Sequence, residues 1–303
     1  MQDKRWIFAG CILLQGLIYG LGNVLTKFAY ASISPFWCLT LRFGLATFIF
    51  FLFFGKSIVG QLKACQLKDW LPSALCMALG YITCNVALDM TAATTVGFLM
   101  ALPIIFTPFF ARLILKRPYR LMYLPAQIAV VLGLYLFCSN GGSFTFGLGE
   151  GLSLFTSIAV AGAFVFGERG LRQMNVVSIS ATQTGLTFIL ALIGALWLEP
   201  EIQFAAVEPV AWWVILYLAI PCTCLAFALQ NIALTGISST TVSMLTCSEP
   251  ILTAAISWLV LGEVLTGTGF VGAAIIIICI VVETYFDGQK QALEQCSSAS
   301  VIK

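Results

Sequence analysis

The stretch NIALTGISSTTV, residues 231–242, decides the fold because it repeats an earlier part of the same chain. Residues 85–96 read NVALDMTAATTV, so the patterns Asn-x-Ala-Leu and Thr-Thr-Val both recur at the same offset. With one residue inserted, Pro103 also falls on Pro250. Self-similarity at a fixed offset indicates an internal duplication. The two helices around residues 85–103 are therefore predicted to recur around residues 231–250.

The composition excludes a soluble protein. Of the 303 residues, 60% are hydrophobic and only 9% are charged, whereas soluble domains carry about 25% charged residues. A chain of this size cannot hide that much apolar surface from water. The formal net charge of +2 supplies no basic surface for nucleic acid. We therefore expect a multi-pass membrane protein whose surroundings are lipid and which has no nucleic-acid partner.

Ten transmembrane helices are predicted, because an apolar helix needs about 20 residues to cross the hydrocarbon core. The run 209–248 is too long for one helix, so Gln230-Asn231 and residues 236–239 are expected to break it into two. The second part then continues to about residue 261. The other runs cover residues 6–26, 35–55, 70–88, 90–111, 121–149 (with the helix ending near Ser139), 151–167, 179–198 and 266–282.

The basic residues indicate how these helices are oriented, since Lys and Arg are retained on the cytoplasmic side of a membrane. With ten crossings and both termini cytoplasmic, every basic loop falls on that side, whereas the opposite loops 139–150 and 199–208 contain no Lys or Arg. The basic loop and terminal residues are Lys4, Arg5, Lys56, Lys63, Lys68, Lys116, Arg117, Arg120, Arg169, Arg172, Lys290 and Lys303.

The duplication and the odd number of helices in each half together predict inverted repeats. Residues 5–140 form the first five-helix repeat and residues 148–287 the second, and a polar cytoplasmic tail follows at 288–303. After five crossings the second copy must enter the membrane upside down. Inverted repeats are a feature of transporters, in which two halves rock about a site at the midplane. The expected fold is thus an all-α membrane protein with ten transmembrane helices in two inverted repeats.

Several other kinds of site are not expected. Ala29-Tyr30-Ala31 resembles a signal-peptidase site, but the apolar stretch before it is too long, so the first helix is expected to be retained. Most of the eleven cysteines lie in apolar runs and are expected to pack rather than to form disulfides. Without histidine, Cys222 and Cys224 do not predict a metal site. No P-loop pattern is present, and no cofactor is expected.

The sequence resembles the drug/metabolite transporter superfamily, and specifically its tandem EamA-type permeases, over about residues 5–287. The first repeat departs from the pattern, with Leu102-Pro103 in place of Glu-Pro and Lys116-Arg117 in place of Gly-Glu. The resemblance implies a secondary permease that exports amino acids or related metabolites. The residues that carry it are ALQNIAL at 228–234, Ser248-Glu249-Pro250, Gly262-Glu263, the Pro-x6-Arg pair Pro35 and Arg42, and Tyr19-Gly20 with Lys27.

Glu249 is the strongest candidate for a functional residue. It directly precedes Pro250 near the middle of the ninth predicted helix, and Pro103 lies at the matching depth of the fourth. Each proline lacks an amide hydrogen and frees a backbone carbonyl, and paired helix breaks near the midplane mark substrate sites in transporters. Charges inside the membrane are functional or paired. We expect Glu249 to bind a substrate amine or to couple a proton, with a structural hydrogen bond between helices as the alternative.

Two basic residues inside the apolar runs are further candidates. Arg42 lies about two turns into the second helix, where it is placed to meet a substrate carboxylate or to bond to carbonyl groups in a packing role. Lys27 lies near the outer end of the first helix, where it attracts anions or extends to the membrane interface. Asp89, at the outer end of the third helix, fits a solvated turn carboxylate better than a site residue.

Polar and aromatic side chains complete the predicted substrate-binding site. Tyr81 and Asn85 lie one turn apart on one face of the third helix. Amide groups would fix a zwitterion, and aromatic rings would receive an apolar side chain, although most aromatic residues of membrane proteins face lipid. The remaining members are Gln230 and Asn231, expected at the end of the eighth helix, and Trp258 in the ninth.

Together these features predict a permease in the cell (cytoplasmic) membrane, with a small-molecule solute as its ligand and no catalytic residues. Export of amino acids or related metabolites by alternating access rests on the family resemblance. Within transport, the alternatives are metabolite uptake and multidrug efflux through the same cavity. Outside transport, the alternatives are a membrane-embedded enzyme and a scaffold. Both a monomer and a homodimer agree with the sequence.

Overall fold

The structure of the chain, a computed structural model, is all-helical over the residues that it describes. These are residues 2–91, 93–117, 124–138, 147–199, 202, 206–262 and 267–282. Within them, eight helices are long and apolar enough to cross a membrane, and Leu124–Phe137 and Gly267–Val282 are shorter apolar helices. The all-α class is confirmed, whereas ten crossings with both termini in the cytoplasm remain a prediction.

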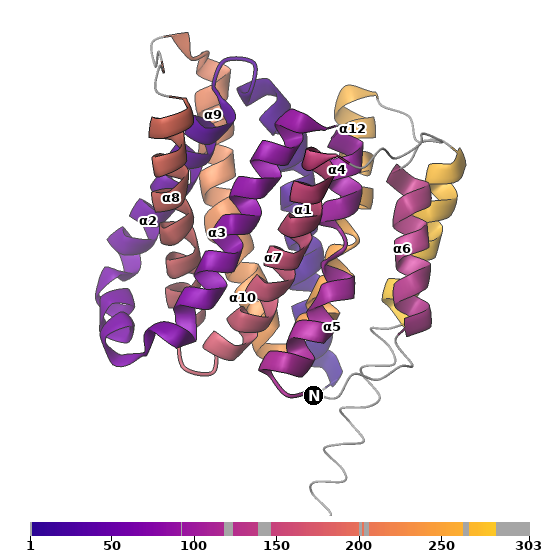
Figure 1. Cartoon of the computed structure of the whole chain (residues 1–303), viewed down its shortest axis with the longest axis horizontal. Helices are drawn as coiled ribbons and strands as arrows, with labels where there is room; N and C mark the ends of the chain where they lie inside the picture. Colours follow the sequence, from indigo (N-terminus) through magenta and orange to yellow (C-terminus); the bar gives the residue numbers. More distant parts are fainter. Residues whose placement is uncertain are drawn as a thin grey trace, which may run out of the picture.

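The helices stand side by side in an upright bundle (Figure 1). The first half of the chain contains α1 (Gln2–Ala29), α2 (Pro35–Ala64), α3 (Leu67–Met90), α4 (Ala93–Met100), α5 (Pro103–Ile114) and α6 (Leu124–Cys138). The second half contains α7 (Leu148–Gly170), α8 (Val176–Leu198), α9 (Pro209–Ala219), the π-helix η3 (Ile220–Leu225), α10 (Ala226–Gly236), α11 (Ser239–Thr246) and α12 (Glu249–Leu261). Gly267–Val282 follows as the last helix.

Two of the apolar spans are interrupted just before a proline. The span 95–114 is divided between α4 and α5, and Pro103 is the first residue of α5. The span 239–260 is divided between α11 and α12, and Pro250 is the second residue of α12. Proline is tolerated in the first turn of a helix, where an amide hydrogen would have no partner in the helix. Each proline therefore lies in the first turn of a new helical segment within its span.

The expected break at Gln230-Asn231 is wrong. Both residues lie inside α10, which continues to Gly236. Their side-chain amides bond to neighbouring helices, so they do not compete with the backbone bonds of their own helix. The break lies at Ile237-Ser238, where Ser238 caps α11 by accepting a hydrogen bond from the backbone amide of Thr241.

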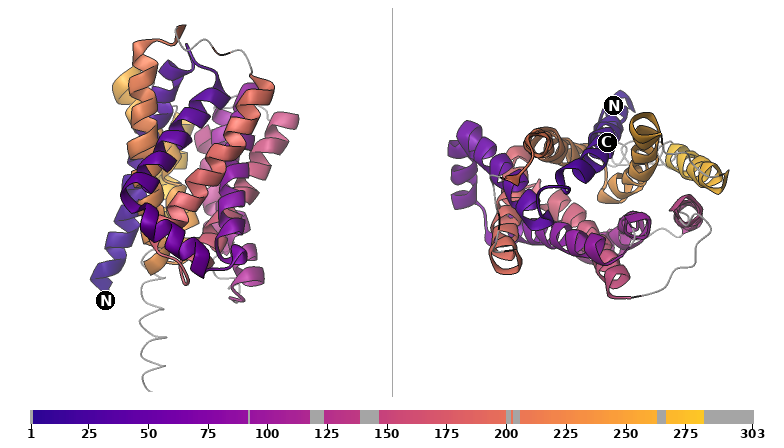
Figure 2. Two further views of the ribbon diagram at one scale, coloured as in Figure 1. Left: turned by 90° about the vertical axis from the view of Figure 1, so that its left-hand side faces the viewer. Right: turned by 90° about the horizontal axis from the view of Figure 1, so that it is seen from above.

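The helices of the two halves of the chain interleave. In the interior, α3 packs on α7 and α8, α2 packs on α8, and α1 packs on α9, α10 and α12. To one side stand α6 and, beside it, the last helix (Figures 1 and 2). Their backbones touch, because a Cβ atom on Gly133 would lie 3.0 Å from the carbonyl oxygen of Gly272. Glycine allows this close approach of two helices.

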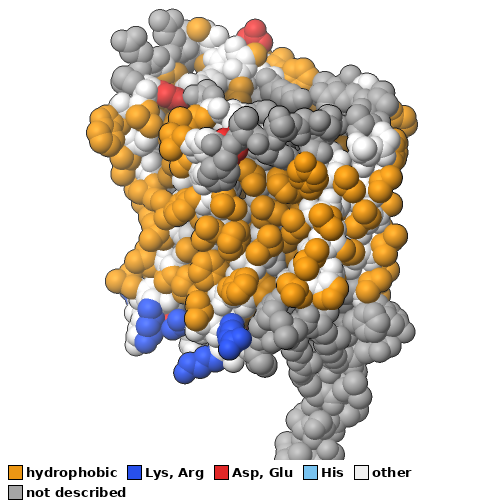
Figure 3. Space-filling model, turned by 45° about the vertical axis from the view of Figure 1, so that its right-hand side comes forward, with side chains coloured by type: hydrophobic (Ala, Val, Ile, Leu, Met, Phe, Trp, Pro, Cys, Tyr) orange, Lys and Arg blue, Asp and Glu red, His pale blue; other side chains and the backbone are white. Residues whose placement is uncertain are grey.

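The surface of the bundle is apolar around its middle. On the face shown in Figure 3, hydrophobic side chains form a broad belt, with Lys and Arg at one end and Asp and Glu at the other. Many large apolar side chains point outward, among them Phe53 at 71% exposure and Trp197 at 84%. An exposed apolar belt of this kind fits lipid rather than water. The separation of charge agrees with the predicted orientation, in which the basic end is cytoplasmic.

The close packing of α1 on α12 at Gly20 generates a stability prediction. A Cβ atom on Gly20 would lie 3.1 Å from the backbone nitrogen of Thr253, so Gly20→Val forces the two helices apart. We expect it to reduce the free energy of unfolding by about 1–3 kcal/mol, the usual cost of overpacking. The matched control is Gly10→Val in the same helix, where a Cβ atom meets nothing within 4 Å. Equal unfolding midpoints of the two purified variants in detergent would contradict the close contact.

Candidate functional site

One face of α1 carries a row of polar side chains. Gln15, Tyr19 and Asn23 follow one another at a spacing of four residues, which places them on the same side of the helix; we call them the polar face of α1. Gln15 is 4% exposed, whereas Asn23 is exposed. Lys27 continues the spacing, but its side chain lies outside the described residues. The row thus leads from the buried middle of α1 towards its end.

The polar face of α1 bonds to three other helices. Gln15 reaches α10, Tyr19 reaches α3, and Asn23 reaches α12, so one helix links segments from both halves of the chain. A polar group inside a membrane needs such partners, because lipid supplies none. The bonds run from Gln15 Nε2 to Gln230 Oε1 (3.0 Å), from the Tyr81 hydroxyl to the Tyr19 hydroxyl (3.3 Å), and from Asn23 Nδ2 to Glu249 Oε1 and Thr253 Oγ1 (3.4 Å each).

Glu249 lies at the interruption between α11 and α12. It is the first residue of α12 and is half-buried, and a negative charge in the first turn is favoured by the positive end of the helix dipole. The two interrupted spans meet here, because the Cys247 thiol donates to the carbonyl oxygen of Ala101 at 3.5 Å. The interruption thus places a half-buried carboxylate next to the exposed side chain of Asn23.

Arg42 is held by the π-helix η3. Its Nε donates to Thr223 Oγ1 at 2.7 Å, and its Nη2 donates to the carbonyl oxygen of Cys222 at 3.1 Å. The guanidinium also lies 5.2 Å from the ring centre of Phe43 and 5.4 Å from that of Tyr81, within the range of cation–π attraction. These contacts fit the packing alternative for Arg42, while its positive charge lies beside the ring of Tyr81, which is also a predicted site residue.

An aromatic cluster fixes the position of Tyr81. Its ring lies edge-on to Phe43 at a centroid distance of 4.9 Å and stacks on Phe227 at 5.9 Å. One turn further along α3, Asn85 accepts a hydrogen bond from the Tyr30 hydroxyl at 2.9 Å and donates to the backbone carbonyl of Tyr81 at 3.2 Å. Burial also raises the pKa of Tyr30, so this hydroxyl keeps its proton and remains a donor.

Two predicted site residues lie elsewhere. Asn231 is fully buried and donates to Ser180 Oγ and Gln183 Oε1, both at 2.9 Å, so it joins α10 to α8. Trp258 is 57% exposed and points away from the bundle, as expected of a lipid-facing aromatic residue. Neither residue contributes to the polar face of α1 or to its partners.

The structure thus brings together part of the predicted set and adds members to it. Glu249, Tyr81 and Gln230 contact the polar face of α1, while Arg42 and Asn85 lie directly beside Tyr81. The residues that sequence reasoning missed are Gln15, Asn23, Thr223 and Thr253, and Tyr19 was noticed only as part of the family resemblance and not as a site residue. The four-residue spacing in α1 was the available signal for Gln15, Tyr19 and Asn23. Within the described residues, no group of three or more His, Cys, Asp and Glu side chains is placed to hold a metal ion.

The two bonds of Arg42 to η3 generate a prediction. Arg42→Lys keeps the charge but cannot reproduce the forked donation to Thr223 and Cys222. We expect the free energy of unfolding to fall by about 2–3 kcal/mol, the contribution of hydrogen bonds to a charged group. Arg112→Lys, an exposed position in α5, is the matched control and should leave it unchanged. A denaturant titration in detergent measures both, and equal stability of the two variants would refute the proposed anchoring.

Comparison with known proteins places this architecture in a family. The model of the EamA-like transporter family matches residues 6–139 and again residues 147–284. An uncharacterized transporter of Archaeoglobus fulgidus is 26% identical over 271 residues, which cover 89% of this chain and 83% of that protein. A solved crystal structure shares the fold with a TM-score of 0.75 at 15% identity, over 92% of this chain and 97% of the other. The chain belongs to the EamA-like transporter family.

Proposed function

We propose that this chain is a secondary transporter that binds a small amphipathic solute beside the polar face of α1 and exposes it alternately to the two sides of the cell membrane. The observation that carries the proposal is the carboxylate of Glu249, which lies at the interruption of a span and bonds to Asn23. Intramembrane carboxylates at broken helices are typical of solute and ion sites. Transport accounts for this arrangement better than a membrane-embedded enzyme or a scaffold does.

The packing of the helices supports two inverted repeats with boundaries at 5–140 and 148–287. Under that relation α1 corresponds to α7, α3 to α10, and the pair α4–α5 to the pair α11–α12. Each contact then has a counterpart: α3 packs on α7 as α10 packs on α1, and α5 packs on α7 as α12 packs on α1. Such a two-fold arrangement allows the halves to exchange conformations, which is the basis of alternating access.

The chemistry of the site favours an amine-bearing solute. Glu249 is placed to bind a positively charged amine, and Asn23 and Thr253 offer hydrogen bonds beside it. The rings of Tyr19 and Tyr81 offer apolar surface to the rest of the solute. Amino acids and related metabolites fit this pattern, and family membership favours their export. A lipophilic amine, as in multidrug efflux, is the second candidate because it uses the same carboxylate and rings.

Replacement of Glu249 tests the site. Glu249→Gln keeps the shape of the side chain but removes its charge, so a solute amine loses a charge-assisted bond worth about 1.5 kcal/mol or more, which corresponds to at least about tenfold weaker flux. Flux into proteoliposomes of amino acids and lipophilic amines, measured across a range of pH, is the readout. If Glu249 also carries a proton, the pH dependence of flux should disappear in the variant.

The control for that experiment is Trp258→Phe, because Trp258 faces away from the bundle, and its flux should match that of the unmodified protein. Normal flux with an unchanged pH dependence in Glu249→Gln would remove this carboxylate from the mechanism. Absence of flux by the unmodified protein for every solute tested would count against transport itself.

The predicted orientation has its own test. Lys116, Arg172 and Glu208 are exposed, and the first two belong to the basic end that we assign to the cytoplasm. Cysteines introduced at positions 116 and 172 should react with a membrane-impermeant maleimide in everted vesicles only, and a cysteine at position 208 in intact cells only. Labelling of positions 116 and 172 from opposite sides of the membrane would overturn the inverted repeat.

A further inference from the structure

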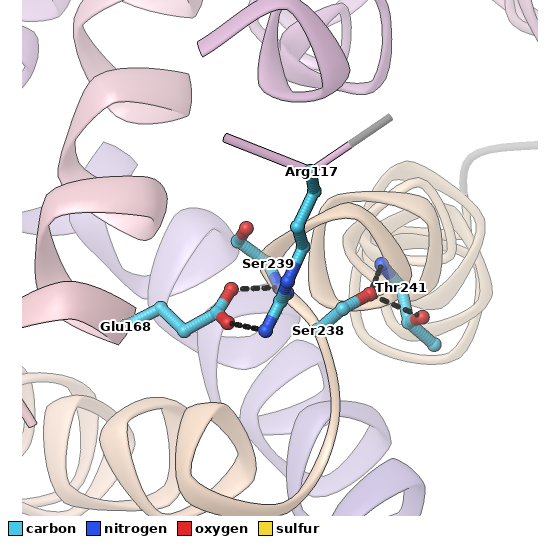
Figure 4. A network of polar contacts seen from close by, with 5 residues as sticks. All are labelled: Arg117, Glu168, Ser238, Ser239 and Thr241. Carbon is cyan, nitrogen blue, oxygen red and sulfur yellow. Dashed lines mark hydrogen bonds and ion pairs between the residues drawn. The ribbon is translucent and has the colours of Figure 1, made fainter. Parts of the chain in front are cut away.

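A buried carboxylate joins three segments at the end of the bundle where the chain begins. Glu168, in the last turn of α7, is only 7% exposed on its side chain. One of its oxygens pairs with Arg117 Nη2 at 2.6 Å, and the other accepts a hydrogen bond from the backbone amide of Ser239 at 2.9 Å. Figure 4 shows both contacts converging on the carboxylate. The segment after α5, the end of α7 and the start of α11 are therefore tied at one point.

The backbone before Arg117 is held in an unusual conformation. Lys116 has a φ of 54°, a left-handed conformation that costs a side-chain-bearing residue about 1 kcal/mol or more. The amide of Arg117 then donates back to the carbonyl of Ala111 at 3.3 Å. This turn brings the guanidinium to Glu168. Helices commonly end on a left-handed residue, and here that turn directs Arg117 towards Glu168.

The third partner connects this point to the candidate site. Ser239 is the first residue of α11, and the neighbouring Ser238 caps the same helix. The other end of α11 is the interruption at Cys247-Ser248, directly before Glu249. Ten residues of largely helical chain span about 15 Å. α11 therefore joins the interruption before Glu249 directly to the hydrogen bond at Ser239.

We propose that Glu168, Arg117 and the Ser239 amide form a latch that closes the bundle at its basic end, and that this latch must open before a solute enters or leaves there. The proposal rests on the alternating access proposed above. The two ends of α11 differ in burial. The Glu168 carboxylate at the latch is buried, whereas at the candidate site Asn23 is exposed and Glu249 is half-buried. Charge-assisted bonds are strong in a low-dielectric setting, and an unpaired buried carboxylate is costly, so the closed state persists until α11 moves.

The thiol of Cys247 reports on the latch without any solute. It lies in the interruption behind α11, is 1% exposed and is bonded to Ala101, so a maleimide reaches it only when α11 separates from its neighbours. The experiment treats the purified full-length protein with N-ethylmaleimide and follows the labelling rate of each cysteine by peptide mass spectrometry. We expect Glu168→Gln to raise the rate at Cys247 by about tenfold, the shift produced by loss of one charge-assisted bond.

Glu199 supplies the matched control. Its carboxylate also accepts hydrogen bonds from backbone amides at the start of a helix, those of Phe36 and Trp37 in α2, at 3.4 and 3.3 Å. Glu199 directly follows α8, and within the described residues its carboxylate bonds to α2 and not to the latch residues. Glu199→Gln should leave the labelling of Cys247 unchanged. Arg117→Gln alters a side chain that is 44% exposed, and it should also raise the labelling rate at Cys247. It replaces Glu168→Gln in the experiment if that variant does not fold.

The labelling rates and the flux measurements decide separate questions. A rate at Cys247 that is equal in Arg117→Gln, Glu199→Gln and the unmodified protein would overturn the latch, whatever the flux. Faster labelling in Arg117→Gln or Glu168→Gln, with an unchanged unfolding midpoint, supports it even if no transported solute has been found. Faster labelling of all cysteines together would mean general loosening of the fold and would also overturn the latch.

Discussion

A chain inside hydrocarbon must pair its own backbone groups, because lipid offers neither donors nor acceptors. This constraint explains how the structure treats the places where its helices are irregular. At the junction of α4 and α5, the hydroxyl of Ser157 donates to the carbonyl of Leu99 and the thiol of Cys247 donates to that of Ala101. Small side chains from other segments thus replace the missing helical bonds. The interruptions are parts of a bonded structure and not gaps in it.

The same constraint shapes η3 and the residues around it. In this wide turn the hydroxyl of Thr223 donates to the carbonyl of Leu218, and Arg42 bonds to Thr223 and to the carbonyl of Cys222. The partly buried guanidinium of Arg42 is thus satisfied by one hydroxyl and one backbone carbonyl of the π-helix. The polar face of α1 solves the related problem for side chains, since each of its members finds a partner on a different helix. Irregular backbone and polar side chains are consequently joined by hydrogen bonds, and at the candidate site Asn23 of α1 bonds to Glu249 at the interruption before α12.

Features that depend on local sequence were predictable. Apolar runs gave the helices, and Pro103 and Pro250 gave the interruptions, because proline acts on its own turn. Features that depend on partners distant in the chain could not be predicted from the sequence. Asn231 reads as a helix-ending residue until α8 supplies its hydrogen bonds. Asn23 was not predicted as a site residue because it carries no charge, although it bonds to Glu249. Trp258 was predicted as a site residue but faces away from the bundle, because aromatic character alone does not tell which side of a helix meets lipid.

The glycine contact between α6 and the last helix has a mechanical consequence. Gly133 and Gly272 bring two backbones together without side chains between them, so the pair can roll at the point of contact but cannot be drawn apart without losing van der Waals attraction along both helices. One of these helices comes from each half of the chain. In the alternating access that we propose, the two halves would stay joined along this outer seam, and the seam would be the pivot about which the remaining helices swing.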